Sequence, residues 1–219
     1  IYYMRAGESL VPMDEQTLKQ KLNQHEQDFS ALVVKGLNIS DLDNEAIASL
    51  RSVLIKNNKQ TLADLDDEKL LIALELITKE GVTFAGLILL GNKQKIDEFL
   101  PSAEVIFEWR QEEKINHDFR EEWREPFLKI YDSIWQSISN RNTRIPIQEG
   151  LFQNEVLAFN EKAIREALLN AVTHRDYSIS SQSVFVKADI QKLTVISPGG
   201  FLPGITPKNV IEKQALFGL

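Results

Sequence analysis

The segment that most constrains this fold runs from Asn160 to Tyr177, NEKAIREALLNAVTHRDY. Asn160 is a favoured N-cap residue, and Glu161 suits the positive end of a helix dipole. Because neither glycine nor proline interrupts the residues that follow, the segment predicts one helix that ends near His174. Its apolar residues recur at helical spacing and predict the face that packs on the core. These residues are Ala163, Ile164, Ala167, Leu168, Ala171 and Val172.

A polar stripe runs along the same predicted helix. Glu166, Asn170 and His174 stand four residues apart, so their side chains stack along one line. At 100° per residue this line lies roughly 110° from the centre of the apolar face, where we expect a half-buried pocket wall. A glutamate can take a proton from water, and an asparagine oxygen is a neutral ligand for Mg²⁺. The same pattern also describes a packed helix whose polar edge is only solvated.

The E-x-x-x-N spacing of Glu166 and Asn170 resembles the N-box of the GHKL ATPases, the class of gyrase, MutL and the histidine kinases. In that class the Glu polarises water and the Asn holds the metal that bridges the phosphates. The longer string REALLNAVTHRDY is similar to a narrower bacterial group, the RecG-helicase-related proteins or predicted transcriptional regulators. That group couples a Schlafen-type AlbA DNA-binding domain to a divergent GHKL-like module. The stretch TFAGLILLG at 83–91 resembles it too.

A glycine-rich turn carries the rest of the resemblance. Ser197-Pro198-Gly199-Gly200, followed by Gly204-Ile205-Thr206, is similar to the same group. In GHKL proteins the corresponding strand ends in D-x-G-x-G, whose Asp binds the adenine amino group, and Ser197 stands at that position here. The resemblance implies ATP and Mg²⁺ as cofactors, Glu166 as the catalytic base and Asn170 as the metal ligand. The nucleotide-binding residues it implies are Asn170, His174, Arg175, Asp176, Ser197, Gly199, Gly200 and Gly204.

Composition narrows the function classes. The chain is 43% hydrophobic and 26% charged, which is usual for a soluble globular protein. No apolar run approaches the roughly 20 residues of a membrane span, and the opening residues do not form a signal peptide. Without cysteine there is neither a disulfide nor a thiolate metal site, which fits the cytoplasm. A net charge of −7 argues against a broad nucleic-acid face, so we expect DNA contacts through flanking domains. A homo-oligomer is also expected.

The remaining chain divides into predicted elements and segments. Strands are predicted at 1–5, 103–110, 144–150, 152–157, 183–189 and 192–197, with an extended stretch at 31–39. Helices are predicted from Asp41 or Asp43 to about Lys56, from Glu68 to about Thr78, after a Thr83 cap, and from Pro126 to about Ser139. The charged run Glu108–Glu125 is typical of a solvated face. Since Ile1 is not an initiator, we expect a fragment of a longer protein: the end of an AlbA-like domain at 1–30, a connecting segment at 31–115, and a GHKL-like module at 116–219.

These patterns predict an α+β protein, in which a helical middle segment leads into a GHKL-like two-layer α/β sandwich with a mostly antiparallel sheet. The expected function is the nucleotide-binding-like regulatory core of a bacterial DNA-binding transcriptional regulator, with at most a weak or degenerate ATPase activity. The alternative is a degenerate assembly or dimerisation module that binds no nucleotide. A helicase motor is excluded because the chain has no G-x-x-x-x-G-K-[ST] phosphate loop.

Overall fold

The computed structural model describes residues 3–6, 9–12, 29–111, 116–149, 152–177 and 179–199. The chain divides into two compact units, one of residues 1–32 with 200–219 and one of residues 33–199. In the first unit, β1 (Tyr3–Ala6) and β2 (Ser9–Pro12) form an antiparallel hairpin, which confirms the strand predicted at the start. A short 3₁₀ turn, η1 (Phe29–Ala31), belongs to the same unit.

The second unit begins with a series of helices. They are η2 (Ile39–Asp41), α2 (Asn44–Lys56), α3 (Gln60–Ala63), α4 (Asp67–Ala73), α5 (Phe84–Leu90) and α6 (Lys93–Phe99), with β3 (Ile77–Thr78) paired to β4 (Gly81–Val82). Asp43 caps α2 by accepting the backbone N–H groups of Glu45 and Ala46. The caps at Asp43 and Thr83 confirm two predicted helix starts, because a short polar side chain satisfies N–H groups that the helix leaves unpaired.

A four-stranded sheet forms the second half of this unit. Its strands are β5 (Val105–Trp109), β6 (Phe119–Trp123), β9 (Val184–Ala188) and β10 (Leu193–Ile196), in the order β10-β9-β5-β6. Only β5 and β9 run parallel, and the other neighbours are antiparallel. The architecture is therefore α+β with a mostly antiparallel sheet, as predicted. The sheet also crosses the boundary expected at residue 115, since β5 precedes it.

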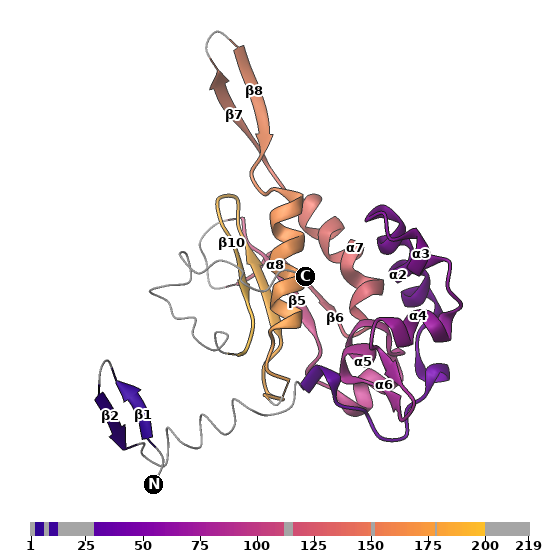
Figure 1. The fold of residues 1–219 in the computed structure, drawn as a ribbon. Helices are drawn as coiled ribbons and strands as arrows, with labels where there is room; N and C mark the ends of the chain where they lie inside the picture. Colours follow the sequence, from indigo (N-terminus) through magenta and orange to yellow (C-terminus); the bar gives the residue numbers. More distant parts are fainter. Residues whose placement is uncertain are drawn as a thin grey trace. The chain divides into compact units, whose positions relative to one another are not determined.

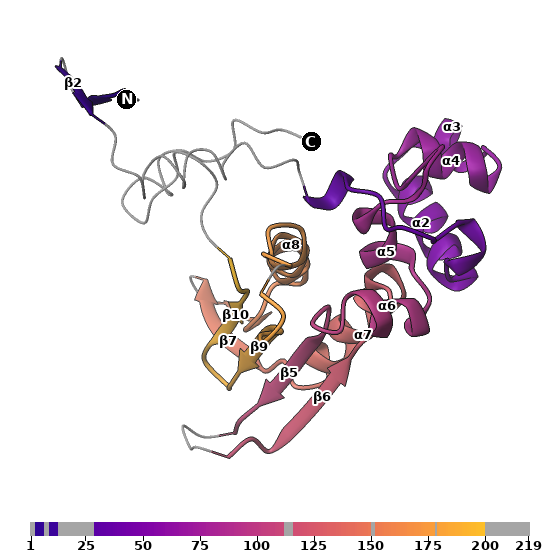
Figure 2. The ribbon, with the colours of Figure 1, turned by 90° about the horizontal axis from the view of Figure 1, so that it is seen from below.

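Two further helices, α7 (Phe127–Ser139) and α8 (Glu161–Thr173), cover one face of this sheet (Figures 1 and 2). The parallel pairing of β5 and β9 requires a crossover between them, and the helices supply it. Alternate residues of β9 are buried beneath the helices: Val184, Val186 and Ala188. Arg165 of α8 joins the helices, because its guanidinium lies 4.7 Å from the Tyr131 ring centroid and 2.8 Å from Asp132.

The charged run at 108–125 is only partly the solvated face that was predicted. Most of its described residues between 111 and 122 are exposed, but the run also contains the edge strand β6, which was not predicted. Glu108 is only 6% exposed and forms ion pairs with Arg110 (3.0 Å) and Arg120 (2.6 Å). Opposite charges on neighbouring strands thus neutralise one another on the sheet, and this pairing is invisible in the linear order of the residues.

The second predicted helix of the middle segment is also shorter than expected. It was predicted to reach Thr78, but α4 ends at Ala73 and Ile77 begins strand β3. The backbone turns at Glu75, whose φ is +57°, and the carbonyl groups of Glu75 and Leu76 accept hydrogen bonds from the Thr83 hydroxyl at 3.1 and 3.0 Å. A tertiary contact therefore ends this helix, where the sequence offered only Gly81 as a stop.

Two other features complete the unit. Strands β7 (Arg144–Glu149) and β8 (Phe152–Leu157), both predicted, pair with each other in a separate antiparallel ribbon between α7 and α8 (Figure 1).

Within the described part of the chain, no helix has the length and apolar character needed to cross a bilayer.

We predict that Thr83→Ala lowers the free energy of unfolding by about 2–3 kcal/mol. Thr83 is 1% exposed, and its hydroxyl also accepts the Gly86 N–H at 3.1 Å. The substitution removes a helix cap and leaves buried polar groups without a partner. Urea unfolding measures the loss, and Thr83→Ser, which keeps the hydroxyl, is the matched control. An equal loss in both variants would show that the methyl group matters and the hydrogen bonds do not.

Candidate functional site

Helix α8 places the candidate residues, and its local signals act as predicted. The Asn160 side chain accepts the Ala163 N–H at 3.1 Å, and the helix continues unbroken to Thr173 with His174 as its C-cap. The buried residues of the helix are Ile164, Leu168, Ala171 and Val172. Two residues predicted in the core face differ: Ala163 is exposed and Ala167 is half-buried. The buried stripe is narrower than predicted because α8 packs at the sheet edge formed by β10, as Figure 2 shows.

The polar stripe of α8 lies on the outside of the molecule. Glu166, Asn170 and His174 are all exposed, where the sequence predicted a half-buried pocket wall. The Asn170 Nδ2 donates to Glu166 Oε1 at 3.4 Å, so the two side chains meet one turn apart as their spacing requires. This bond uses neither the Asn170 carbonyl oxygen nor the second Glu166 oxygen. Those are the atoms that a cation and a water molecule would use.

The turn after β10 packs against the C-terminal end of α8. Ser197 donates its hydroxyl to the Ala171 carbonyl at 2.6 Å, and Asp176 donates its backbone N–H to the Pro198 carbonyl at 2.8 Å. Gly199 has a φ of +148°, and a Cβ added there would lie 3.0 Å from the His174 carbonyl oxygen. The turn therefore needs glycine for both its backbone conformation and its close approach. The structure thus brings Ser197 and Gly199 to the end of the polar stripe. The predicted residues Gly200 and Gly204 lie outside the described residues.

Arg175 belongs to the interior. Its residue exposure is 5%, and its Nη2 donates to the carbonyl groups of Ile179 (3.1 Å) and Gln182. The guanidinium carbon lies 4.6 Å from the centroid of the Tyr177 ring. Burial lowers the pKa of Arg175 and raises that of Tyr177, whose hydroxyl donates to the Val172 carbonyl at 2.9 Å. Arg175 therefore holds the loop between α8 and β9, whereas the sequence grouped it with the nucleotide ligands. Asp176 is exposed.

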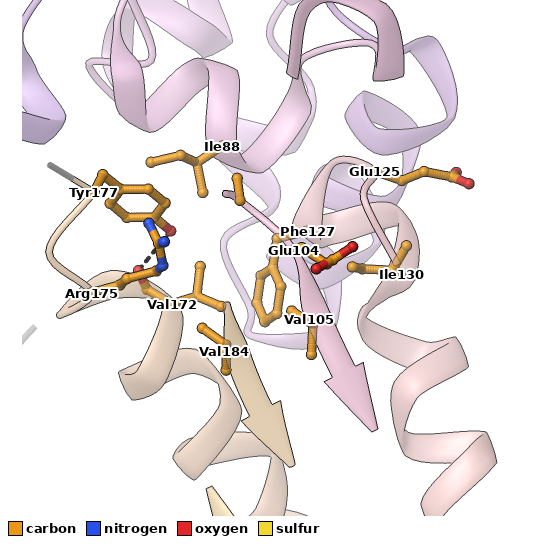
Figure 3. A pocket seen from close by; sticks show the side chains of 11 residues that line it. Ile88, Glu104, Val105, Glu125, Phe127, Ile130, Val172, Arg175, Tyr177 and Val184 are labelled. Carbon is orange, nitrogen blue, oxygen red and sulfur yellow. Dashed lines mark hydrogen bonds between the residues drawn. The ribbon is translucent and has the colours of Figure 1, made fainter. Parts of the chain in front are cut away.

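A small cavity lies on the core side of α8, and sequence reasoning missed it (Figure 3). Arg175, Tyr177 and Val172 line one side, while Glu104 and Phe127 come from elements distant in sequence. The space open to the centre of a water molecule is about 20 Å³, enough for roughly one water. Glu104 is already paired, because it accepts bonds from Ser183 (2.8 Å) and Arg124 (3.0 Å). A nucleotide does not fit in a space of this size.

The described residues contain no cluster of three or more histidine, aspartate or glutamate side chains arranged to hold a metal ion. A bound Mg²⁺ at Asn170 would therefore take most of its ligands from phosphate oxygens and water, as Mg²⁺ often does in phosphate-transfer sites.

Comparison with known proteins adds a family match and a fold match. Residues 16–106 match a family described as a domain of unknown function, DUF8451. The fold is similar to the crystal structure of the DIP2311 protein from Corynebacterium diphtheriae, with a TM-score of 0.69 and 26% sequence identity. That similarity covers 97% of this chain and 42% of the other, so the chain spans less than half the length of this relative. A search of curated proteins finds no match.

We predict that Gly199→Ala destabilises the protein by about 1–3 kcal/mol, the usual cost of a strained backbone conformation, and disrupts the docked turn. Gly36→Ala is the matched control. Gly36 also has a positive φ (+85°), but a Cβ there would meet no atom within 4 Å. Urea unfolding of both variants separates backbone strain from the contact with His174. If Gly199→Ala costs no more than Gly36→Ala, the turn does not depend on that close approach.

Proposed function

We propose that this chain is a nucleotide-binding regulatory core of a bacterial DNA-binding transcriptional regulator. The observation that carries the proposal is the contact between the Ser197-Pro198-Gly199 turn and the last turn of α8, beneath the exposed Asn170 and His174. Both segments carry the resemblance to the RecG-related group, although 20 residues separate them in sequence. Their meeting in space is what a ligand site shared by the two motifs requires.

The exposed atoms of this site have complementary tasks in the proposed function. The Asn170 carbonyl oxygen coordinates Mg²⁺, and the free Glu166 oxygen orients water. The Ser197 hydroxyl donates its hydrogen to the Ala171 carbonyl group. Its oxygen can therefore still accept a hydrogen bond from the amino group of a nucleotide base. A hydroxyl is a weaker acceptor than the aspartate of GHKL proteins, since charge-assisted hydrogen bonds are roughly twice as strong. We therefore expect little preference for ATP over GTP.

In the proposed function, regulation depends on the two hydrogen bonds that join the turn to Ala171 of α8 and to Asp176, just after the helix. A ligand that contacts both segments favours the arrangement in which they are docked, and so changes the population of any state in which they separate. In the proposed regulator, flanking domains carry the DNA contacts and respond to that change. This division of labour agrees with the net charge of −7, which disfavours a broad DNA-binding face on this chain.

A ligand-free assembly module is the second candidate, and one observation favours it. The Ser197 hydroxyl has its partner in α8, and the Pro198 carbonyl has its partner in Asp176, just after the helix, so the turn has a structural role even without a nucleotide. The two candidates differ in what the exposed Asn170 and Glu166 do, since neither residue supports the packing of the core.

We predict that ATP or ADP with Mg²⁺ raises the melting temperature of the protein. Ligand at 100 times its Kd adds about 2.7 kcal/mol of stability by mass action. Asn170→Ala abolishes the Mg²⁺-dependent part of the shift because it deletes the proposed metal ligand. Glu166→Ala keeps the shift and removes only turnover.

Titration calorimetry with each nucleotide measures these affinities directly. The matched control is Asn57→Ala, which removes an exposed asparagine at the end of α2, distant in sequence from the motifs. It is expected to bind nucleotide like the unaltered protein. If the protein and its folded variants release no heat with any nucleotide, the assembly module becomes the better account.

A further inference from the structure

The ribbon of β7 and β8 is an arm without a partner strand in the described part of the chain. It pairs only with itself and extends away from the four-stranded sheet (Figure 1). Its base is fixed, because the Asn142 side chain accepts the Phe159 N–H at 2.9 Å and donates to the Phe159 carbonyl at 2.7 Å. A two-stranded ribbon is at best marginally stable by itself in water. A fixed base with an unsupported ribbon points to an additional partner.

The hydrogen-bond pattern shows which edge of the arm is open. The Ala158 N–H donates to the Thr143 carbonyl at 2.9 Å, so these residues form a hydrogen-bonded pair at the base of the ladder. Such pairs alternate along an antiparallel ribbon, which places Pro146 opposite Glu155 in a pair whose backbone groups point outward. Pro146 lacks an N–H and so blunts the outer edge of β7. On β8, Glu155 and Leu157 point complete N–H and C=O groups outward.

The arm also carries exposed apolar side chains on both faces. Ile145, Ile147 and Val156 share one face by the register and are 46%, 40% and 43% exposed. Leu157, on the other face, is 49% exposed. Four large apolar residues on a short ribbon are more than the scattered ones of an ordinary surface, and they mark the arm as an interaction site.

We propose that β8 pairs antiparallel with β8 of a second copy of this chain, with the two-fold axis passing through Val156. Glu155 of each copy then exchanges two backbone hydrogen bonds with Leu157 of the other. The result is a four-stranded ribbon, β7-β8-β8-β7, whose outer edges are both closed by Pro146. This interface is independent of nucleotide binding at α8.

Self-complementarity is the reason for choosing a second copy. A two-fold contact needs a surface that matches itself, and in this register Val156 meets Val156 of the second copy. Arg144 lies beside Leu157 on β7 and forms an ion pair with Glu155 of its own chain at 3.6 Å, so the charge of the Glu155 that borders the second copy is already offset. Other registers are less favourable. A two-fold axis at Glu155 would place the two Glu155 carboxylates directly opposite each other. A two-fold axis at Asn154 would leave Leu157 without a facing residue in strand β8 of the second copy.

Sedimentation equilibrium of the full chain tests the pairing, with a mass twice that of one chain as the expected result. Glu155→Pro removes the N–H group that points outward from β8. It leaves the hydrogen bonds between β7 and β8 intact, because that N–H group takes no part in them, as at Pro146. It is expected to raise the dimer dissociation constant about 30-fold or more, equivalent to losing two backbone hydrogen bonds. Glu155→Thr keeps the N–H and is the matched control, which should remain dimeric.

Single cysteines test the register, because the chain has none of its own. Val156→Cys places two sulfur-bearing residues about 4.5 Å apart between Cα atoms, within the range for a disulfide. Oxidation should therefore cross-link this variant. Asn154→Cys should not cross-link, since four residues of register separate its two copies by roughly 13 Å. A monomer at every concentration, a dimer that survives Glu155→Pro, or cross-linking at Asn154 in place of Val156 would each overturn the proposal.

Discussion

The buried guanidinium of Arg175 fixes the loop on which the candidate site depends. A charged group at 5% exposure is costly unless it is bonded, and Arg175 offsets part of this cost through its Nη2, which donates to the carbonyl groups of Ile179 and Gln182, and through the face of the Tyr177 ring. Its Nε and Nη1 are buried without a hydrogen-bond partner among the described residues. These contacts determine where the chain leaves α8 and where it enters β9. Since β9 and β10 form a hairpin, they also determine where the turn after β10 returns to the helix.

This arrangement gives α8 two sides with different tasks. The core side packs Leu168 and Val172 on the sheet and encloses a cavity with room for about one water, so it serves stability. The outer side carries Glu166 and Asn170 with polar atoms that no core contact uses. Gly199 connects the two, because it packs on the helix end while remaining exposed itself. The proposed nucleotide site needs this separation, since binding on the outside leaves the core unchanged.

Sequence patterns predicted the features that depend on interactions between residues close together in the chain. The caps at Asn160 and Thr83 depend on neighbours in sequence, and both appear where predicted. The apolar periodicity of α8 is confirmed for four of its six predicted residues, Ile164, Leu168, Ala171 and Val172. The predictions were wrong where a feature depends on contacts between residues distant in sequence. Helix α4 ends early because Thr83 binds the carbonyl groups that follow it, and Glu108 is buried because Arg120 of another strand neutralises it. The sequence placed Arg175 in the HRDY motif but held no signal that its side chain would turn toward the core.

The most direct test of the central claim uses Mn²⁺ in place of Mg²⁺, because both metals bind oxygen ligands in octahedral geometry and Mn²⁺ is paramagnetic. In a ¹H–¹⁵N NMR spectrum with ADP, Mn²⁺ should broaden signals most strongly at the Asn170 side-chain amide and at the backbone amides of His174 and Gly199. Mg²⁺ with ADP should shift the same signals without broadening them. Broadening centred on Val184 and the core-side cavity, or none beyond that of free Mn²⁺, would contradict a nucleotide site on the outer side of α8.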